Sequence, residues 1–147
     1  MSLTGPISSP NRSAKTLHHI GFVVTSIDET AGDFAESVDG KWDGVIIHDP
    51  LQRVRVTFIR PANREQSVMF ELVEPASEDS PVNNFLRRGG GLHHVCFEVL
   101  QLDAELESVR SRGGLTARPP QPAVAFSGRR IAWVYTRRKL LVEYLEK

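Results

Sequence analysis

The chain has 147 residues, the length of one domain or of two small modules that share a core. Lys and Arg together number 18, as do Asp and Glu, so the formal charge is zero and disfavours a nucleic acid or an anionic membrane surface as partner. Cys96 is the only cysteine, which excludes an intrachain disulfide and a cysteine-rich zinc site. No apolar run approaches the roughly 20 residues of a membrane-spanning helix, so we expect a soluble, cytoplasmic protein.

Residues 1–15 predict a flexible N-terminal arm. They are rich in Ser, Pro and Asn, and they lack the apolar core of about 7–15 residues that a secretory signal needs. We therefore expect one folded domain over residues 16–147.

From residue 16 onward, hydrophobic periodicity and turn-forming residues divide the chain into two similar halves. The first half reads as a strand, a helix and three strands, at Leu17–Val24, Asp28–Val38, Val45–His48, Arg53–Arg60 and Ser67–Glu74. A short helix at Ser80–Arg88 and a flexible joint at Gly89–Gly91 follow. The second half reads as a strand, a helix and two strands, at His93–Val99, Leu102–Arg112, Arg129–Thr136 and Leu140–Leu145, with an undefined Pro-rich stretch over 115–126.

The two halves also match in sequence. His19–Val24 resembles His94–Val99 at an offset of 75 residues, and Val68–Glu74 resembles Leu140–Glu146 at an offset of 72. Chance similarity between strands rich in Val and Phe is the alternative explanation. Two matches at nearly one offset instead predict tandem βαβββ modules, at about 16–76 and 92–147, joined by a linker helix at 79–91. The expected fold is α+β, with one curved mixed sheet around a cavity.

Strand alternation predicts which histidines face that cavity. The apolar residues of 20–24 need a helix to cover them, so His19 falls on the opposite, concave face, and the same phase places His94 there. His18 and His93 are then expected on the helix side or at the strand edge.

Two glutamates share the predicted face. Glu71 and Glu143 occupy equivalent positions in the last strands of the two halves. Taken singly, a strand histidine or glutamate is usually solvated, but two of each converging in an apolar hollow need a compensating cation. One divalent metal ion bound by His19, Glu71, His94 and Glu143 fits, and such mixed sites accept Co, Ni, Mn, Zn or Fe.

These motifs resemble the vicinal oxygen chelate superfamily (glyoxalase, bleomycin resistance protein and dioxygenase), and within it the methylmalonyl-CoA epimerases. The resemblance covers roughly 17–145, and its most specific stretch is DSPVNNFLRRGGGLHHV, residues 79–95. It implies metal ligands at His19, Glu71, His94 and Glu143. It also implies Glu143 as the first candidate for the proton-abstracting base, with Glu71 as the second.

The function implied is a metal-dependent isomerase or epimerase that removes a proton beside a carbonyl through a stabilised enolate, with an acyl-CoA thioester such as methylmalonyl-CoA as the first substrate to test. A glyoxalase I-like lactoylglutathione lyase uses the same four ligands, and a metal-free protein that binds a small molecule such as an antibiotic shares the fold. An iron dioxygenase is disfavoured by the second carboxylate. Val56, where some epimerases carry an acidic residue, and the short turn 136–139 depart from the family pattern.

Three further predictions concern binding and packing. Arg129 and Arg130 are candidate contacts for an anionic part of the substrate, although charges that protect a strand edge are the more ordinary explanation. Cys96 shares the phase of His94 and is interpreted as a small core residue. The edges of a partly open sheet favour a homodimer.

Overall fold

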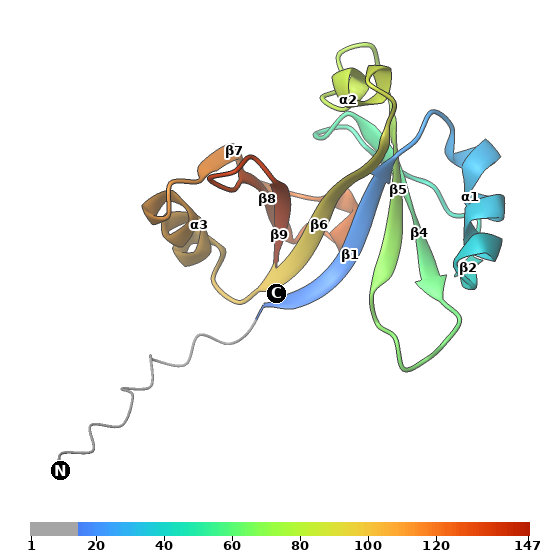
Figure 1. Cartoon of the computed structure of the whole chain (residues 1–147), viewed down its shortest axis with the longest axis horizontal. Helices are drawn as coiled ribbons and strands as arrows, with labels where there is room; N and C mark the ends of the chain where they lie inside the picture. The colour runs from blue at the N-terminus through green and yellow to red at the C-terminus, as the bar shows by residue number, and fades with distance from the viewer. Residues whose placement is uncertain (1–14) are drawn as a thin grey trace.

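The computed structural model describes residues 15–147, which form a single curved, mixed sheet of nine strands (Figure 1). All but one residue of the predicted N-terminal arm, 1–15, lies outside the described residues. Among the described residues no helix has the length and apolarity to span a membrane. The elements are β1 Thr16–Val23, α1 Ile27–Ser37, β2 Gly40–Trp42, β3 Ile47–Asp49, β4 Val54–Pro61, β5 Met69–Pro75, α2 Asn83–Arg87, β6 Gly91–Val99, α3 Leu102–Ser111, β7 Leu115–Pro122, the 3₁₀ helix η1 Val124–Phe126, β8 Arg130–Tyr135 and β9 Leu141–Glu146.

The strand order shows the internal repeat. It runs β2-β4-β5-β1-β6-β9-β8-β7, with β3 also paired to β4. In each module the first strand pairs in parallel with the last, β1 with β5 and β6 with β9, and the two first strands pair antiparallel at the centre. The predicted α+β fold with a curved mixed sheet is therefore confirmed, and we call residues 16–76 module 1 and residues 92–147 module 2.

Three local predictions need correction. Module 1 contains the additional strand β2, and the strand expected at Val45–His48 is the shorter β3. The undefined Pro-rich stretch forms β7 and η1, because a strand at the edge of a sheet tolerates prolines that cannot donate to a neighbour. The linker helix α2 spans only five residues, since positive φ angles at Gly89, Gly90 and Gly91 end it.

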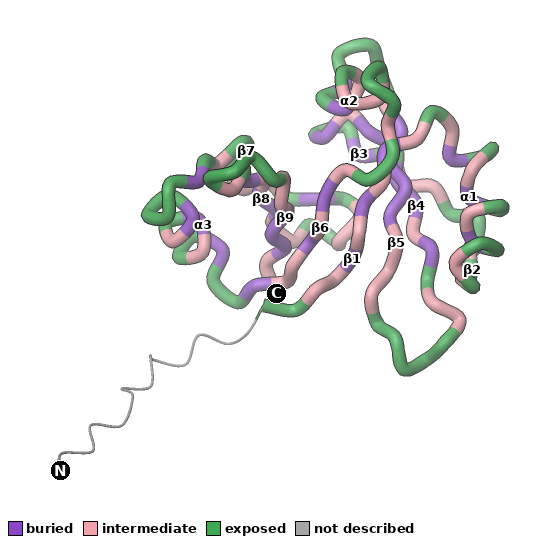
Figure 2. Tube along the Cα trace, in the orientation of Figure 1, coloured by how far each residue is buried: buried purple, intermediate pink, exposed green. Residues whose placement is uncertain are grey.

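The two long helices cover their own halves of the sheet (Figures 1 and 2). Helix α1 contacts β2, β4 and β5, whereas α3 contacts β7, β8 and β9. Each helix presents an apolar stripe at helical spacing to its strands. The fully or nearly fully buried residues of these stripes are Ile27, Ala31 and Ala35 in α1 and Leu102, Leu106 and Val109 in α3.

Equivalent glutamates fix the starts of these helices. The Glu74 carboxylate accepts a 2.6 Å hydrogen bond from the backbone N–H of Ile27, the first residue of α1, and pairs with Arg55. In module 2, Arg130 donates to Glu146 at 2.7 Å. Hydrogen bonding to Arg130, and to a smaller degree the backbone of Leu102, the first residue of α3, lowers the pKa of Glu146. Free N–H groups at a helix start favour such carboxylates. The second glutamate of each E-x-x-E motif thus anchors a helix, which leaves the first for the cavity.

Candidate metal centre

Two β-bulges place paired histidines at the centre of the sheet. Between β1 and β6 the register passes from Leu17 opposite Phe97 to His19 opposite Cys96, so His18 is the extra residue. The register then passes from Gly21 opposite His94 to Phe22 opposite Leu92, which makes His93 the extra residue of β6. A bulge re-aims the side chains beside it.

The bulges correct one prediction. His93 was expected on the helix side or at the strand edge, but it lines the cavity. His18 packs edge-on against Phe126, another residue of the cavity wall, with the ring centroids 5.4 Å apart. Strict alternation failed here because each bulge inserts one residue and shifts the phase of the strand.

The four predicted ligand side chains converge, as the repeat implied. The Nε2 atoms of His19 and His94 are 3.2 Å apart. Glu71 Oε2 lies 3.0 Å from the first and 3.1 Å from the second. Glu143 Oε2 lies 3.8 Å from His19 Nε2 and 3.3 Å from His94 Nε2. All four residues are buried, and one ligand atom from each lies within 4.8 Å of the others. We call these four residues the His/Glu cluster.

Small residues opposite the histidines make room for their rings. A Cβ atom added to Gly21 would overlap the ring of His94, its partner across the strands. Cys96, fully buried, is the partner of His19 on the other side of the pseudo-twofold axis. Burial, with Glu143 as a further cause, raises the pKa of the Cys96 thiol to about 12, so Cys96 is a packing residue rather than an activated nucleophile.

The first histidine of each pair, His18 or His93, contacts the ring of the ligand histidine that follows it. His18 Nδ1 lies 2.8 Å from His19 Nδ1, and His93 Nδ1 lies 2.9 Å from His94 Nδ1. Burial, followed by the neighbouring charge of His94, lowers the pKa of His93 to about 4. A neutral His93 can accept a hydrogen bond from His94 Nδ1–H, which leaves the Nε2 lone pair of His94 directed at the cluster. Such contacts are typical behind metal-binding histidines.

Burial and charge act in opposite directions on the residues of the cluster. Burial disfavours the charged forms of His19 and Glu71, but their mutual attraction and hydrogen bonds outweigh it. As a result, the pKa of His19 is raised and that of Glu71 is lowered. Glu71 Oε2 thus depends on the two histidines for its pairing, whereas Glu143 Oε1 is buried without a hydrogen-bond partner among the described residues. An unpaired buried carboxylate oxygen is costly.

These observations fit a divalent metal ion. Ligand atoms about 2.0–2.2 Å from one ion lie roughly 3–4 Å from each other, and the cluster distances that involve a histidine nitrogen, from 3.0 to 3.8 Å, fall in this range. Two imidazole nitrogens with two carboxylates are a donor set that first-row transition metals accept. An ion would replace the proton that the raised pKa favours on His19 and would give Glu143 Oε1 a partner.

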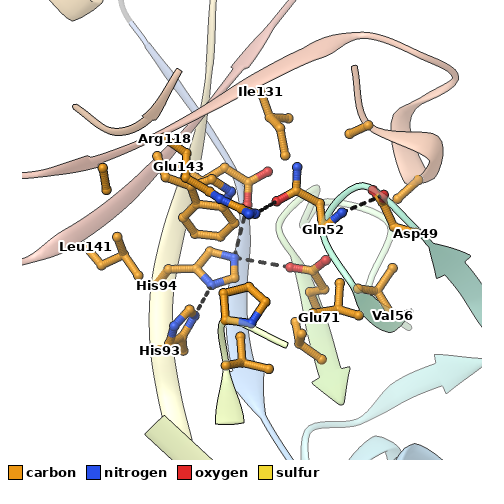
Figure 3. A pocket seen from close by; sticks show the side chains of 18 of the residues that line it. Asp49, Gln52, Val56, Glu71, His93, His94, Arg118, Ile131, Leu141 and Glu143 are labelled. Carbon is orange, nitrogen blue, oxygen red and sulfur yellow. Dashed lines mark hydrogen bonds and ion pairs between the residues drawn. The ribbon is translucent and has the colours of Figure 1, made fainter. Parts of the chain in front are cut away.

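The cluster lies at one side of a cavity of about 380 Å³ (Figure 3). His94, Glu71 and Glu143 line it, whereas His19 lies behind them. The surrounding wall is mostly apolar, and its aliphatic and aromatic members include Val54, Val56, Val73, Val82, Phe126, Ile131, Trp133 and Leu141. Such a pocket is suited to a small organic molecule with one polar end.

The two predicted substrate-binding arginines do not line this cavity. Arg129 pairs with Glu98 at 2.6 Å, and Arg130 holds the helix-anchoring Glu146. Three polar residues that sequence reasoning missed, Asp49, Gln52 and Arg118, do line it. None belongs to the internal repeat, so no pattern singled them out.

Residues 18–133 match the family model described as the glyoxalase/bleomycin resistance protein/dioxygenase superfamily. An uncharacterized protein of Bacillus subtilis, YqjC, is 35% identical over 137 residues, which cover 88% of this chain and 91% of the relative. The mitochondrial methylmalonyl-CoA epimerase of Mus musculus is 31% identical over 107 residues, or 71% of this chain. The match spans only 57% of the mouse protein's length.

Solved structures agree on the fold. A hypothetical protein of Bacillus halodurans, BH1468, superimposes with a TM-score of 0.77 at 30% identity over 91% of this chain and 95% of that one. A variant methylmalonyl-CoA epimerase of Streptomyces coelicolor, in complex with 2-nitronate-propionyl-CoA, gives a TM-score of 0.74 at 23% identity over 91% of this chain and 99% of that one. With its repeated modules and buried His/Glu cluster, this chain belongs to the glyoxalase/bleomycin resistance protein/dioxygenase superfamily.

Proposed function

We propose that the protein is a divalent-metal-dependent epimerase or isomerase that removes a proton from the carbon beside a thioester carbonyl, with methylmalonyl-CoA as the first substrate to test. The observation that carries the proposal is the buried His/Glu cluster at the side of a small, mostly apolar cavity. The similarity to methylmalonyl-CoA epimerases supports the choice of substrate.

His19, Glu71, His94 and Glu143 would hold the ion. When bound, it would stabilise the negative charge that develops on the carbonyl oxygen as the neighbouring carbon loses its proton. The apolar wall excludes water from the reacting carbon and so strengthens that stabilisation.

Glu143 is the first candidate for the base. Its Oε1 atom is buried without a hydrogen-bond partner among the described residues, while its Oε2 atom faces His94 at 3.3 Å. One oxygen can therefore accept a proton while the other stays with the cluster. Glu71, its counterpart across the pseudo-twofold axis, is the candidate for the opposite face of the carbon, since epimerisation needs a proton donor there.

Metal content is the first test. We expect about one divalent ion per chain in protein purified without chelator, and loss of that ion in His94→Ala. His48→Ala is the matched control, because His48 is an exposed histidine of β3. Absence of metal from the wild type, even after soaking with Co or Ni, contradicts the proposal and leaves the binding-protein alternative.

Proton exchange is the second test. In D2O the metal-loaded protein should exchange the α-proton of methylmalonyl-CoA and interconvert its two isomers, as NMR can follow. A metal-loaded protein that does neither, but isomerises the adduct of glutathione and methylglyoxal, is instead the glyoxalase-like lyase, which uses the same donor set. The homodimer, the cytoplasmic location and substrate contacts by Arg129 and Arg130 stay predictions.

A further inference from the structure

A second polar group lies in the cavity near the His/Glu cluster (Figure 3). The Arg118 Nη1 atom, from β7 of module 2, donates a 3.0 Å hydrogen bond to Gln52 Oε1, from the turn before β4 in module 1. Gln52 is only 7% exposed, and its backbone N–H donates to the Asp49 side chain at 3.0 Å. The guanidinium is thus held by a fixed turn of the other module.

The strand register places Arg118 in line with Glu143 of the cluster, and both line the cavity although irregular pairing flanks Arg118 in β7. Arg118 pairs with Trp133 of β8, and Trp133 pairs with Glu143 of β9. Directly paired residues of neighbouring strands project to the same face of a sheet. Because neighbouring strands lie about 4.8 Å apart, the backbones of Arg118 and Glu143 are roughly 10 Å apart, which one small molecule can span.

Arg118 has no acidic partner within the part of the chain that the structure describes. No carboxylate there lies within 4 Å of its guanidinium, and its one side-chain hydrogen bond goes to the neutral amide of Gln52. Arg129 and Arg130, in contrast, are each paired with carboxylates. A guanidinium presents five N–H donors in a planar fork that suits a carboxylate. At the wall of an apolar cavity, the remaining donors of Arg118 are available to an anionic ligand.

We propose that Arg118, oriented by Gln52, binds a free carboxylate on the acyl part of the substrate and so makes the cavity selective for thioesters of dicarboxylic acids. This inference rests on the proposed function for the identity of the thioester. The phosphates of coenzyme A carry the same anionic chemistry, so the test must separate the two sources.

The test measures binding by calorimetry to metal-loaded protein, with methylmalonyl-pantetheine and propionyl-pantetheine as probes. Both lack the nucleotide phosphates, and only the first carries a carboxylate. We expect Arg118→Gln to weaken binding of methylmalonyl-pantetheine roughly 10- to 100-fold and to leave propionyl-pantetheine unchanged. Arg118→Lys, which keeps the charge but not the fork, should recover part of the loss. Arg110→Gln, an exposed arginine of α3, is the matched control.

Equal losses for both probes, no loss for either, or wild-type protein that binds neither would overturn the inference. A loss seen with methylmalonyl-CoA but absent with methylmalonyl-pantetheine would assign Arg118 to a phosphate and also overturn it. Proton exchange in D2O, measured on the same samples, tests the proposed function separately. If binding is carboxylate-selective but no proton exchange occurs, the proposed epimerase function is contradicted. If exchange occurs and Arg118→Gln binds methylmalonyl-pantetheine as tightly as the wild type, only the role of Arg118 is contradicted.

Discussion

The two modules have equivalent residues in the His/Glu cluster but different residues in the wall of the cavity. Each contributes a histidine pair at a bulge, a glutamate from its last strand and a second glutamate that anchors its helix. Outside these positions they diverge. Module 1 carries two short strands, β2 and β3, with the turn that holds Gln52, whereas module 2 carries the long edge strand β7 with Arg118. Strand β3 contacts η1, and residues of both line the cavity.

This difference separates two requirements. A metal centre on a pseudo-twofold axis needs matching donors from both sides, so the repeated positions serve the chemistry. Selectivity needs a wall that differs from one side to the other, because a substrate has no twofold symmetry. The unrepeated residues are therefore where the choice of substrate is made.

The largest effect should come from substituting the two cluster glutamates one at a time. We expect Glu143→Gln to lower the rate of proton exchange by about 100- to 10,000-fold, because it removes the candidate base. Glu71→Gln should lower the rate less for the isomer whose proton Glu143 removes than for the other isomer. NMR in D2O with each isomer of methylmalonyl-CoA measures both rates. Glu36→Gln, an exposed glutamate of α1, is the control. Equal losses in both variants for both isomers mean that the modules do not divide the work.

The next largest effect concerns the small residues, Gly21 and Cys96, that leave space for the rings of His94 and His19. Gly21→Ala places a methyl group in the ring of His94, so we expect metal affinity to fall roughly 10- to 100-fold. Cys96→Ala removes only the thiol beside His19 and should change affinity by no more than a few-fold. Gly32→Ala is the matched control, because a Cβ there meets no atom within 4 Å. Metal titrations would argue against this account if Gly21→Ala bound as tightly as Gly32→Ala.

The sequence predicted the symmetric part of the molecule and missed the asymmetric part, for physical reasons. His19, Glu71, His94 and Glu143 could be found because a repeat doubles each signal and the strand period assigns a face. The face of His93 could not be found, since nothing in the sequence marks the point at which a bulge shifts the alternation of side chains. Arg118 was missed because it precedes two prolines in a strand that only its edge position permits.

A smaller effect concerns the histidines behind the ligands. His93→Phe keeps a ring of similar size in the cavity but removes the acceptor for His94 Nδ1–H, and His18→Phe does the same for His19. We expect each to lower metal affinity about tenfold. The ¹⁵N shifts of His94 in His93→Phe should also show a mixture of tautomers, which a purely steric change would not cause. Unchanged affinity and shifts in both variants would remove these histidines from the metal centre.

The smallest effect is the pH dependence of stability in the metal-free protein. The pKa of His19 is raised above 6.5, so its contribution to folding is complete below about pH 6.5 and is lost as the pH rises. The pKa of His93 is lowered to about 4, so its contribution is lost as the pH falls from 6.5 towards 4, and the lowered pKa of Glu71 adds a further loss below about 4.5. Thermal unfolding should therefore show a maximum near pH 6.5. Because a metal ion replaces the proton on His19, the increase in melting temperature on adding the ion should grow as the pH rises above that maximum. An increase that does not grow with rising pH would mean that His19 keeps its proton when the ion binds, and module 1 would then contribute only its carboxylate.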